Sequence, residues 1–364
     1  MNKTKIYRKK LDKNERLVCS VQPAMFARLI VGLYYDIKVS NRVKWMIKSY
    51  CISLSSFICY LIIFRDDNFS LHPKLTSVME YITYVTFSFL TCDKYLFRYL
   101  RFNPRTDGYP IFLYLCKKFE KFFKIIICLF VSFKILGVVL MMQSWPILST
   151  PKYIWGTLAL HFLWLASHMG RLVFILVYGI LFCRMRTIRI IFENRGFQNT
   201  PQNRLTPKRY ILMYEAVLNS IESVDFPVKF LIFTFICCFA PKLVVSLFEI
   251  MEEMKKGELS LTTFIWFLVE LSPSYLFLLL SAIALDLVSE DVQELLSITI
   301  DRRLNCKNEK ERSEIQEFFQ YLRNNPFNYT LWQVVSLNLR TLLVATSFSI
   351  ANVIAIMQIK NSKI

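Results

Sequence analysis

Histidine and glycine are scarce in this chain, and their scarcity limits the chemistry it can perform. Only 3 histidines (His72, His161 and His168) and 8 glycines occur in 364 residues. A His-rich metal site is therefore not expected, and we find no glycine-rich phosphate loop, nucleophile elbow or paired-carboxylate spacing. We predict that the protein is not an enzyme and has no cofactor. A membrane acyltransferase remains a minor alternative, because His161 and His168 lie two helical turns apart.

Cysteine is present but lacks the spacing of a metal or disulfide framework. The 10 cysteines are scattered, and none forms a Cys-x-x-Cys pair. Several, such as Cys51, Cys128 and Cys183, lie in apolar segments. We therefore expect mostly free thiols.

Apolar residues are abundant: 54% of the chain is hydrophobic, and the mean hydropathy is +0.38. A soluble domain of this length would be more polar. A helix needs about 20 mostly apolar residues to cross a bilayer. Seven stretches satisfy this condition: 43–64, 76–99, 122–143, 153–183, 227–250, 262–288 and 334–359. The expected fold is all-α, with seven transmembrane helices surrounded by membrane lipids.

The net charge of +18 is explained by membrane topology rather than by binding to nucleic acid. Lys and Arg lie between the apolar stretches instead of forming one basic module. Connections on one side of the membrane contain 29 of them, and those on the other side contain 7. Cytoplasmic loops collect Lys and Arg. We therefore expect a cytosolic N-terminus and an extracellular C-terminus, with no nucleic-acid partner.

Two other features agree with this topology. The opening residues are basic and polar and do not resemble a signal peptide. The glycosylation sequon at Asn68 falls in the first predicted extracellular loop. Seven spans with the N-terminus inside are the inverse of a G-protein-coupled receptor, which remains an alternative together with a multi-span transporter. The scarcity of glycine and the lack of an internal repeat argue against the transporter.

The predicted spans divide the chain into four regions. Residues 1–42 form a cytosolic N-terminal segment, 43–288 the first six spans, 289–333 a charged helical cytosolic connection, and 334–364 the last helix. Pro326 to Lys360 contain no further proline or glycine, so a single helix there would extend about 50 Å. This exceeds the hydrocarbon core of about 30 Å. We interpret the segment as a cytosolic helix that continues into a membrane helix.

The last span resembles that of the insect gustatory receptors, a family of the insect chemoreceptor superfamily. Their pattern there is TYhhhhhQF, where h is hydrophobic. Here Ala351-Asn352 replaces Thr-Tyr, residues 353–357 supply the five hydrophobic positions, Gln358 matches, and Ile359 replaces Phe. The N-terminal segment is also similar to the family's proline-containing, Leu-Gly-Leu-like opening, at Pro23 and at Val31-Gly32-Leu33.

The resemblance implies a function. Such receptors are tetrameric, ligand-gated, non-selective cation channels in the plasma membrane of sensory neurons. The implied partners are a small-molecule tastant such as a bitter compound, permeating Na⁺, K⁺ and Ca²⁺, and further copies of the chain as a homotetramer, or related receptors as a heteromer. The last span of each subunit would line the pore. The residues expected to form the pore and gate are Ser347, Ala351, Ile354 and Gln358, which share one helical stripe, with Ile359 as an outer gate. A second stripe, formed by Ser349, Asn352, Ala355 and Ile359, is the alternative pore face, and a position at the membrane interface is the alternative role of Gln358.

The resemblance also places a ligand pocket among spans two to six, on the outer side. Aromatic and polar residues in the outer halves of spans two, four and six are the candidates: Tyr81, Tyr84, Trp155, His161, Trp164, Trp266 and Glu270. Tyr and Trp near span ends are often interfacial residues instead, and His161 is equally suited to packing. A buried Glu270 needs a partner, and Lys242 or His161 could supply it.

Other ionisable residues within the spans are expected near the cytosolic ends. By hydropathy, Asp93, Lys94, Arg171, Asp286 and Arg340 cluster there. We predict that they form structural ion pairs around a cytosolic anchor.

Overall fold

The computed structural model describes residues 17–18, 21–37, 39–65, 71–144, 154–195, 206–257, 260–332 and 335–362, and these are almost entirely helical. The helices are α2 (Gln22–Ile30), α3 (Asn41–Arg65), α4 (Leu71–Thr91), α5 (Lys94–Tyr99), α6 (Pro110–Ser144), α7 (Ile154–Arg195), α8 (Pro207–Lys256), α9 (Leu261–Asn305), α10 (Glu309–Asn324) and α11 (Leu339–Ser362). Two short strands, β1 (Thr330–Leu331) and β2 (Val335–Ser336), pair antiparallel between α10 and α11.

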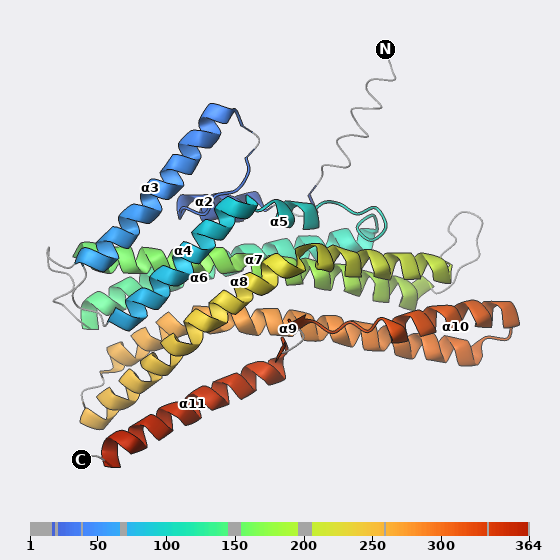
Figure 1. Cartoon of the computed structure of the whole chain (residues 1–364). Helices are drawn as coiled ribbons and strands as arrows, with labels where there is room; N and C mark the ends of the chain where they lie inside the picture. Colours follow the sequence, from blue (N-terminus) through green and yellow to red (C-terminus); the bar gives the residue numbers. More distant parts are fainter. Residues whose placement is uncertain are drawn as a thin grey trace.

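Helix α7 is the centre of the bundle (Figure 1). It contacts α3, α4, α6, α8 and α9, and 89% of its most apolar window is buried. Small residues allow its neighbours to approach closely. A Cβ atom on Gly170 would lie 2.9 Å from the ring of Tyr84 on α4, and one on Gly179 would overlap the ring of Phe119 on α6. The central helix therefore fixes the positions of the helices around it.

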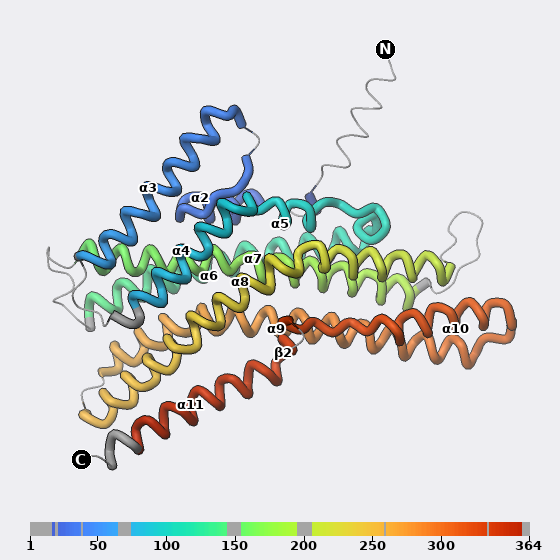
Figure 2. Tube along the Cα trace, in the orientation of Figure 1, coloured from blue at the N-terminus to red at the C-terminus, as the bar shows by residue number. Residues whose placement is uncertain are grey.

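Several helices are longer than a bilayer requires. Helix α8 has 50 residues and α9 has 45, and 50 residues extend about 75 Å. The end of α7, the start of α8, the end of α9 and all of α10 continue together on one side of the molecule (Figure 1). Helix α11 lies along the outside of the bundle against α8 and α9, and it ends on the opposite side (Figure 2).

Local signals explain where these helices begin and end. Ser260 accepts a hydrogen bond of 3.0 Å from the Thr263 backbone N–H and so caps α9. Asn308 caps α10 through the Lys310 N–H at 3.1 Å. Gly257, with φ of +69°, ends α8 in the left-handed conformation that glycine adopts without strain. Ser and Asn are favoured at helix N-caps, and Gly is favoured directly after the last helical residue.

Within the described residues, each of the seven predicted spans overlaps one long helix, and six of these helices meet the length and hydropathy expected of a membrane helix. The exception is α4, which has 21 residues but carries Lys74, Glu80 and several hydroxyl side chains. Both charged side chains are buried inside the bundle. The polarity that lowers the hydropathy of α4 thus faces protein.

The predicted boundary of the second span was wrong. A single helix over 76–99 was expected, but α4 ends at Thr91 and α5 begins at Lys94. Between them Cys92 and Asp93 adopt left-handed backbone conformations, with φ of 50° and 51°. The carboxylate of Asp93 forms a buried ion pair of 2.8 Å with Arg28 on α2. This tertiary contact holds the break, and hydropathy contains no signal for it.

The prediction of one continuous helix from Pro326 to Lys360 was also wrong. The chain forms the β1–β2 hairpin, with Trp332 at φ of 45°, and α11 begins only at Leu339. Asn338 caps the helix through the Thr341 N–H at 2.8 Å, and Asp286 on α9 accepts from the Leu339 N–H at 3.0 Å. The membrane helix is therefore pinned to α9 at its start. Helix α9 continues without a break past residue 288, to Asn305.

Candidate functional site

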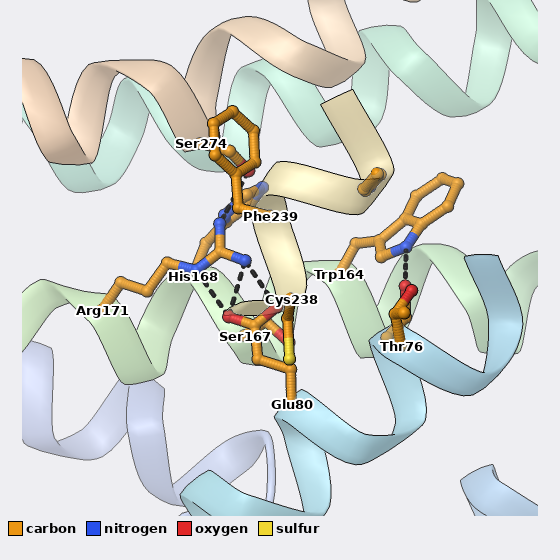
Figure 3. Close-up of a pocket in the computed structure, with 11 residues that line it drawn as sticks. Thr76, Glu80, Trp164, Ser167, His168, Arg171, Cys238, Phe239 and Ser274 are labelled. Carbon is orange, nitrogen blue, oxygen red and sulfur yellow. Dashed lines mark hydrogen bonds and ion pairs between the residues drawn. The ribbon is translucent and has the colours of Figure 1, made fainter. Parts of the chain in front are cut away.

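A small polar cavity lies inside the bundle between α4, α7, α8 and α9 (Figure 3). Its volume of about 10 Å³ is close to what one water molecule requires. The lining is mostly polar and includes charged groups of both signs. It consists of Thr76, Ser77, Glu80, Trp164, Ser167, His168, Arg171, Cys238, Phe239, Lys242 and Ser274.

An ion pair crosses the cavity wall from α4 to α7. Arg171 donates from Nε and Nη2 to the two carboxylate oxygens of Glu80, at 2.8 and 2.6 Å. Its remaining nitrogen, Nη1, donates to Ser274 Oγ on α9 at 2.6 Å and lies 3.2 Å from His168 Nδ1. Each of the three guanidinium nitrogens thereby has a hydrogen-bond partner. The group also lies 4.0 Å from the ring centroid of Phe235. This two-pronged geometry suits arginine and a carboxylate.

A second charged group lies beside the first. Glu270 on α9 accepts from Lys134 on α6 at 2.6 Å and from Lys242 on α8 at 2.9 Å. The ammonium groups of Lys134 and Lys242 lie 5.0 and 4.2 Å from the ring centroid of Trp164. Of the two partners proposed for Glu270, Lys242 forms the ion pair. His161 instead places Nε2 at 2.8 Å from Met141 Sδ.

Four of the seven predicted pocket residues lie in this region. Trp164 lines the cavity and donates from its indole N–H to Ser77 Oγ at 3.1 Å. Glu270 forms the ion pairs just described, and the ring of His161 lies 5.0 Å from that of Trp164 in an edge-on arrangement. Tyr84 follows Glu80 by one turn and packs on Gly170. These four residues belong to α4, α7 and α9, which are three of the helices that line the cavity.

The other three lie elsewhere. Tyr81 is buried, but its hydroxyl bonds to Ser55 Oγ and to the Val31 carbonyl, each at 2.9 Å. It supports the turn at Gly32, whose φ of +88° requires glycine. Trp266 is buried edge-on against Phe267. Trp155 is 65% exposed on the outer surface of the bundle, where an interfacial role fits better.

Sequence reasoning missed part of the cluster. Arg171 was expected near the cytosolic anchor, but it lies at the cavity and pairs with Glu80. Lys134, Ser167 and Ser274 were not singled out. A lysine in the middle of an apolar helix is itself a signal of a buried partner, so Lys134 could have been found. The two serines carry no such signal.

The predicted pore residues lie on the exposed surface of α11. This helix packs on the bundle through Ser349, Val353 and Met357, which are 8%, 1% and 9% exposed. Ser347, Ala351, Ile354 and Gln358 are all exposed, and only 11% of the most apolar window of the helix is buried. Ile359 belongs to α11, but its side chain lies outside the described set, as does Asn68. Within the described ranges, no group of His, Cys, Asp or Glu could hold a metal ion.

Comparison with known proteins identifies the fold. No protein-family model matches the chain, and no curated protein matches its sequence. Two solved structures are similar over 93% of this chain and 97% of their own: the insect olfactory receptor OR5 from Machilis hrabei in complex with eugenol, and the same receptor without it. The TM-scores are 0.71 and 0.69, at 12% and 13% identity. The chain therefore has the fold of an insect olfactory receptor, which confirms the helical, chemoreceptor-type fold expected from the resemblance.

Proposed function

We propose that the chain belongs to the insect chemoreceptor superfamily and is a ligand-gated, non-selective cation channel of the plasma membrane. Four copies assemble around one pore, with the N-terminus in the cytosol and the C-terminus outside. The ligand is a small organic tastant, so the protein acts as a gustatory receptor. The shared fold supports this proposal, together with the similarity of the last span to the gustatory pattern.

The exposed stripe of α11 is the observation that carries the proposal. An apolar helix with Ala351, Ile354 and Gln358 on its free surface cannot enclose a water path alone, so a pore along it requires several copies. Rings of Gln358 amides would hydrate a permeating ion, and rings of Ile354 would close the path by excluding water. The buried residues of the same helix, Val353 and Met357, attach it to its own subunit.

The cavity supports a ligand-gated mechanism. It lies between α4, α7, α8 and α9, and the last two of these helices also hold α11. A ligand that separates α8 from α9 would therefore act on the helix that lines the pore. Coupling of this kind requires only that the ligand bind the open arrangement more tightly than the closed one.

Current recording tests the proposal directly. The chain is expressed in oocytes and exposed to a panel of small organic compounds, with uninjected oocytes as the control. We expect a ligand-evoked cation current that persists when G-protein signalling is blocked. A current that disappears under the block would indicate a G-protein-coupled mechanism, and ligand uptake without a channel current would indicate a transporter.

A further inference from the structure

Arg171, Glu80 and Lys242 line the cavity, and Lys242 belongs to a second charged cluster that also contains Lys134 and Glu270. The two clusters are not balanced in the same way. Arg171 and Glu80 pair one to one, whereas Lys134 and Lys242 share the single carboxylate of Glu270. The Lys134 and Glu270 side chains are 5% and 4% exposed, and that of Lys242 is 16% exposed. Among the residues that the structure describes here, three cations thus face two carboxylates. A buried cation without its own counterion is unfavourable, so this cluster is suited to an additional anion.

The cavity wall also holds hydrogen-bonding atoms that are not used. Ser167 Oγ and His168 Nε2 are buried and have no hydrogen-bond partner within the described residues. Both residues line the cavity beside Lys242, and both are only 2% exposed. Buried polar atoms normally have partners, in the protein or in a bound molecule. The cavity thus presents hydrogen-bonding atoms without partners, on Ser167 and His168, and a cation, Lys242, that shares its only counterion. Together these groups favour a ligand that is both charged and polar.

The helices around the cavity contain the means to open it. The cavity holds about one water molecule, so a larger ligand requires its walls to move. Pro241 directly precedes Lys242 on α8, and Pro273 directly precedes Ser274 on α9. A proline inside a helix removes one backbone hydrogen bond and favours bending at that point. Both helices are therefore weakened where they line the cavity.

We propose that this cavity is an anion-binding subsite and that the ligand is a small organic acid. Its carboxylate pairs with Lys242 and becomes the second counterion for the two lysines that share Glu270. A hydroxyl or carbonyl group on the same molecule meets Ser167 and His168. The inference rests on the proposed ligand pocket and specifies its chemistry: the ligand is an acid, rather than the neutral apolar compound that an aromatic pocket alone would favour.

Binding to the purified full-length protein tests this inference without any need for current. The probes are propanoate, lactate and benzoate, each compared with its methyl ester, and sodium chloride serves as the inorganic anion. Ligand-dependent thermal stabilisation in detergent reports the binding. We expect at least one acid to stabilise the protein and its ester to do so at least tenfold more weakly. Equal binding of acid and ester, or an equal effect of chloride, would overturn the proposal.

Charge-changing variants at one site should act in opposite directions. Lys242→Gln should weaken acid binding by at least tenfold, while Lys242→Arg should retain it. Glu270→Gln should tighten binding, because both lysines lose their shared counterion and the acid replaces it. Lys229→Gln is the matched control, since Lys229 lies on the same helix but pairs with Asp225 away from the cavity. No change in Lys242→Gln would contradict the proposal.

The outcomes separate this inference from the channel proposal. Acid binding without any ligand-evoked current would support the subsite and contradict the channel. A current evoked only by neutral compounds, with no binding of acids, would support the channel and contradict the subsite. If Lys242→Gln or Glu270→Gln fails to fold, the contrast between acid and ester on the unchanged protein and on Lys242→Arg still decides the question.

Discussion

The guanidinium of Arg171 and the carboxylate of Glu80 form two parallel hydrogen bonds, at 2.8 and 2.6 Å, inside the helix bundle. Both side chains are about 5% exposed, so neither charge reaches water. The pair joins α4 to the central helix α7, and Ser274 extends the link to α9. It explains how α4 carries Glu80 inside the bundle: the charge has a counterion in the protein.

Removing one partner of this pair should destabilise the fold severely. In Glu80→Gln or Arg171→Met, the remaining charge is buried without a counterion, and loss of one partner of a buried pair typically costs about 3–5 kcal/mol. We expect a much lower surface density and a lower thermal-unfolding midpoint in detergent. The reversed pair, Glu80→Arg with Arg171→Glu, should recover part of the loss.

An exposed ion pair is the control for that experiment. Lys124 and Glu120 pair on the surface of α6 at 3.0 Å, with Lys124 53% exposed. Exposed pairs contribute little, so Lys124→Gln should leave surface density unchanged. An equal loss in Lys124→Gln and Glu80→Gln would mean that any charge change in these helices impairs biogenesis, and the buried pair would have no special role.

The topology gives a prediction that requires no ligand. The 29-to-7 division of Lys and Arg predicts that an epitope at residue 1 is accessible to antibody only after permeabilisation. An epitope at residue 364 should be accessible on intact cells. Immunofluorescence with and without detergent measures both. The reverse pattern would contradict the proposed membership of the chemoreceptor superfamily.

The helices could be predicted from sequence because hydropathy reports them directly. Each predicted span overlaps one long helix. A buried carboxylate requires a cation, and Lys242, one of the two partners proposed for Glu270, pairs with it. The break between α4 and α5 and the break before α11 could not be predicted. Cys92, Asp93 and Trp332 adopt left-handed backbone conformations that non-glycine residues rarely favour. Contacts with distant residues, such as Arg28 with Asp93, hold at least one of these breaks in place.

Some residues of the cavity region were anticipated from sequence, and others were not. Trp164, His161 and Glu270 were chosen because the resemblance implies a pocket in the outer halves of these spans, whose positions follow from hydropathy. Which side of a helix faces the cavity depends on packing, so Trp155 and Tyr81 were grouped with them although their side chains point elsewhere. Arg171 was misplaced because a charge was taken to mark a span end. Its partner Glu80 is 91 residues away in the chain.

The proline in α8 next to the cavity should matter for gating. Pro241→Ala restores a backbone hydrogen bond and stiffens the helix beside Lys242. We expect a smaller maximal ligand-evoked current with little change in surface density. Pro227→Ala is the matched control, because Pro227 lies in the same helix about three turns before the residues that line the cavity, whereas Pro241 directly precedes Lys242. Equal reductions in both variants would indicate a general effect of helix rigidity, with no hinge at the cavity.

Two substitutions in α11 test the proposed pore. Gln358→Ala removes the amide ring, so conductance or ion selectivity should change. Ile354→Ser makes the constriction wettable and should raise the current in the absence of ligand, because hydrophobic gates close by excluding water. Single-channel and whole-cell recordings measure both effects. Normal conductance, selectivity and basal current in both variants would place the ion path elsewhere.

Cysteine scanning along α11 gives the sharpest test, because one helix supplies both the reactive and the inert positions. Cysteines at Ala351, Ile354 and Gln358 lie on the exposed surface, whereas Val353 and Met357 face the bundle. In a pore, an external charged thiol reagent should block current at the first three positions and not at the last two. The unsubstituted chain controls for its native thiols, since Cys128 and Cys237 are exposed. Reactivity should therefore follow the 3.6-residue helical period. In a channel shown to conduct, uniform inertness would mean that this stripe faces lipid or a neighbouring subunit, and the pore assignment would be wrong.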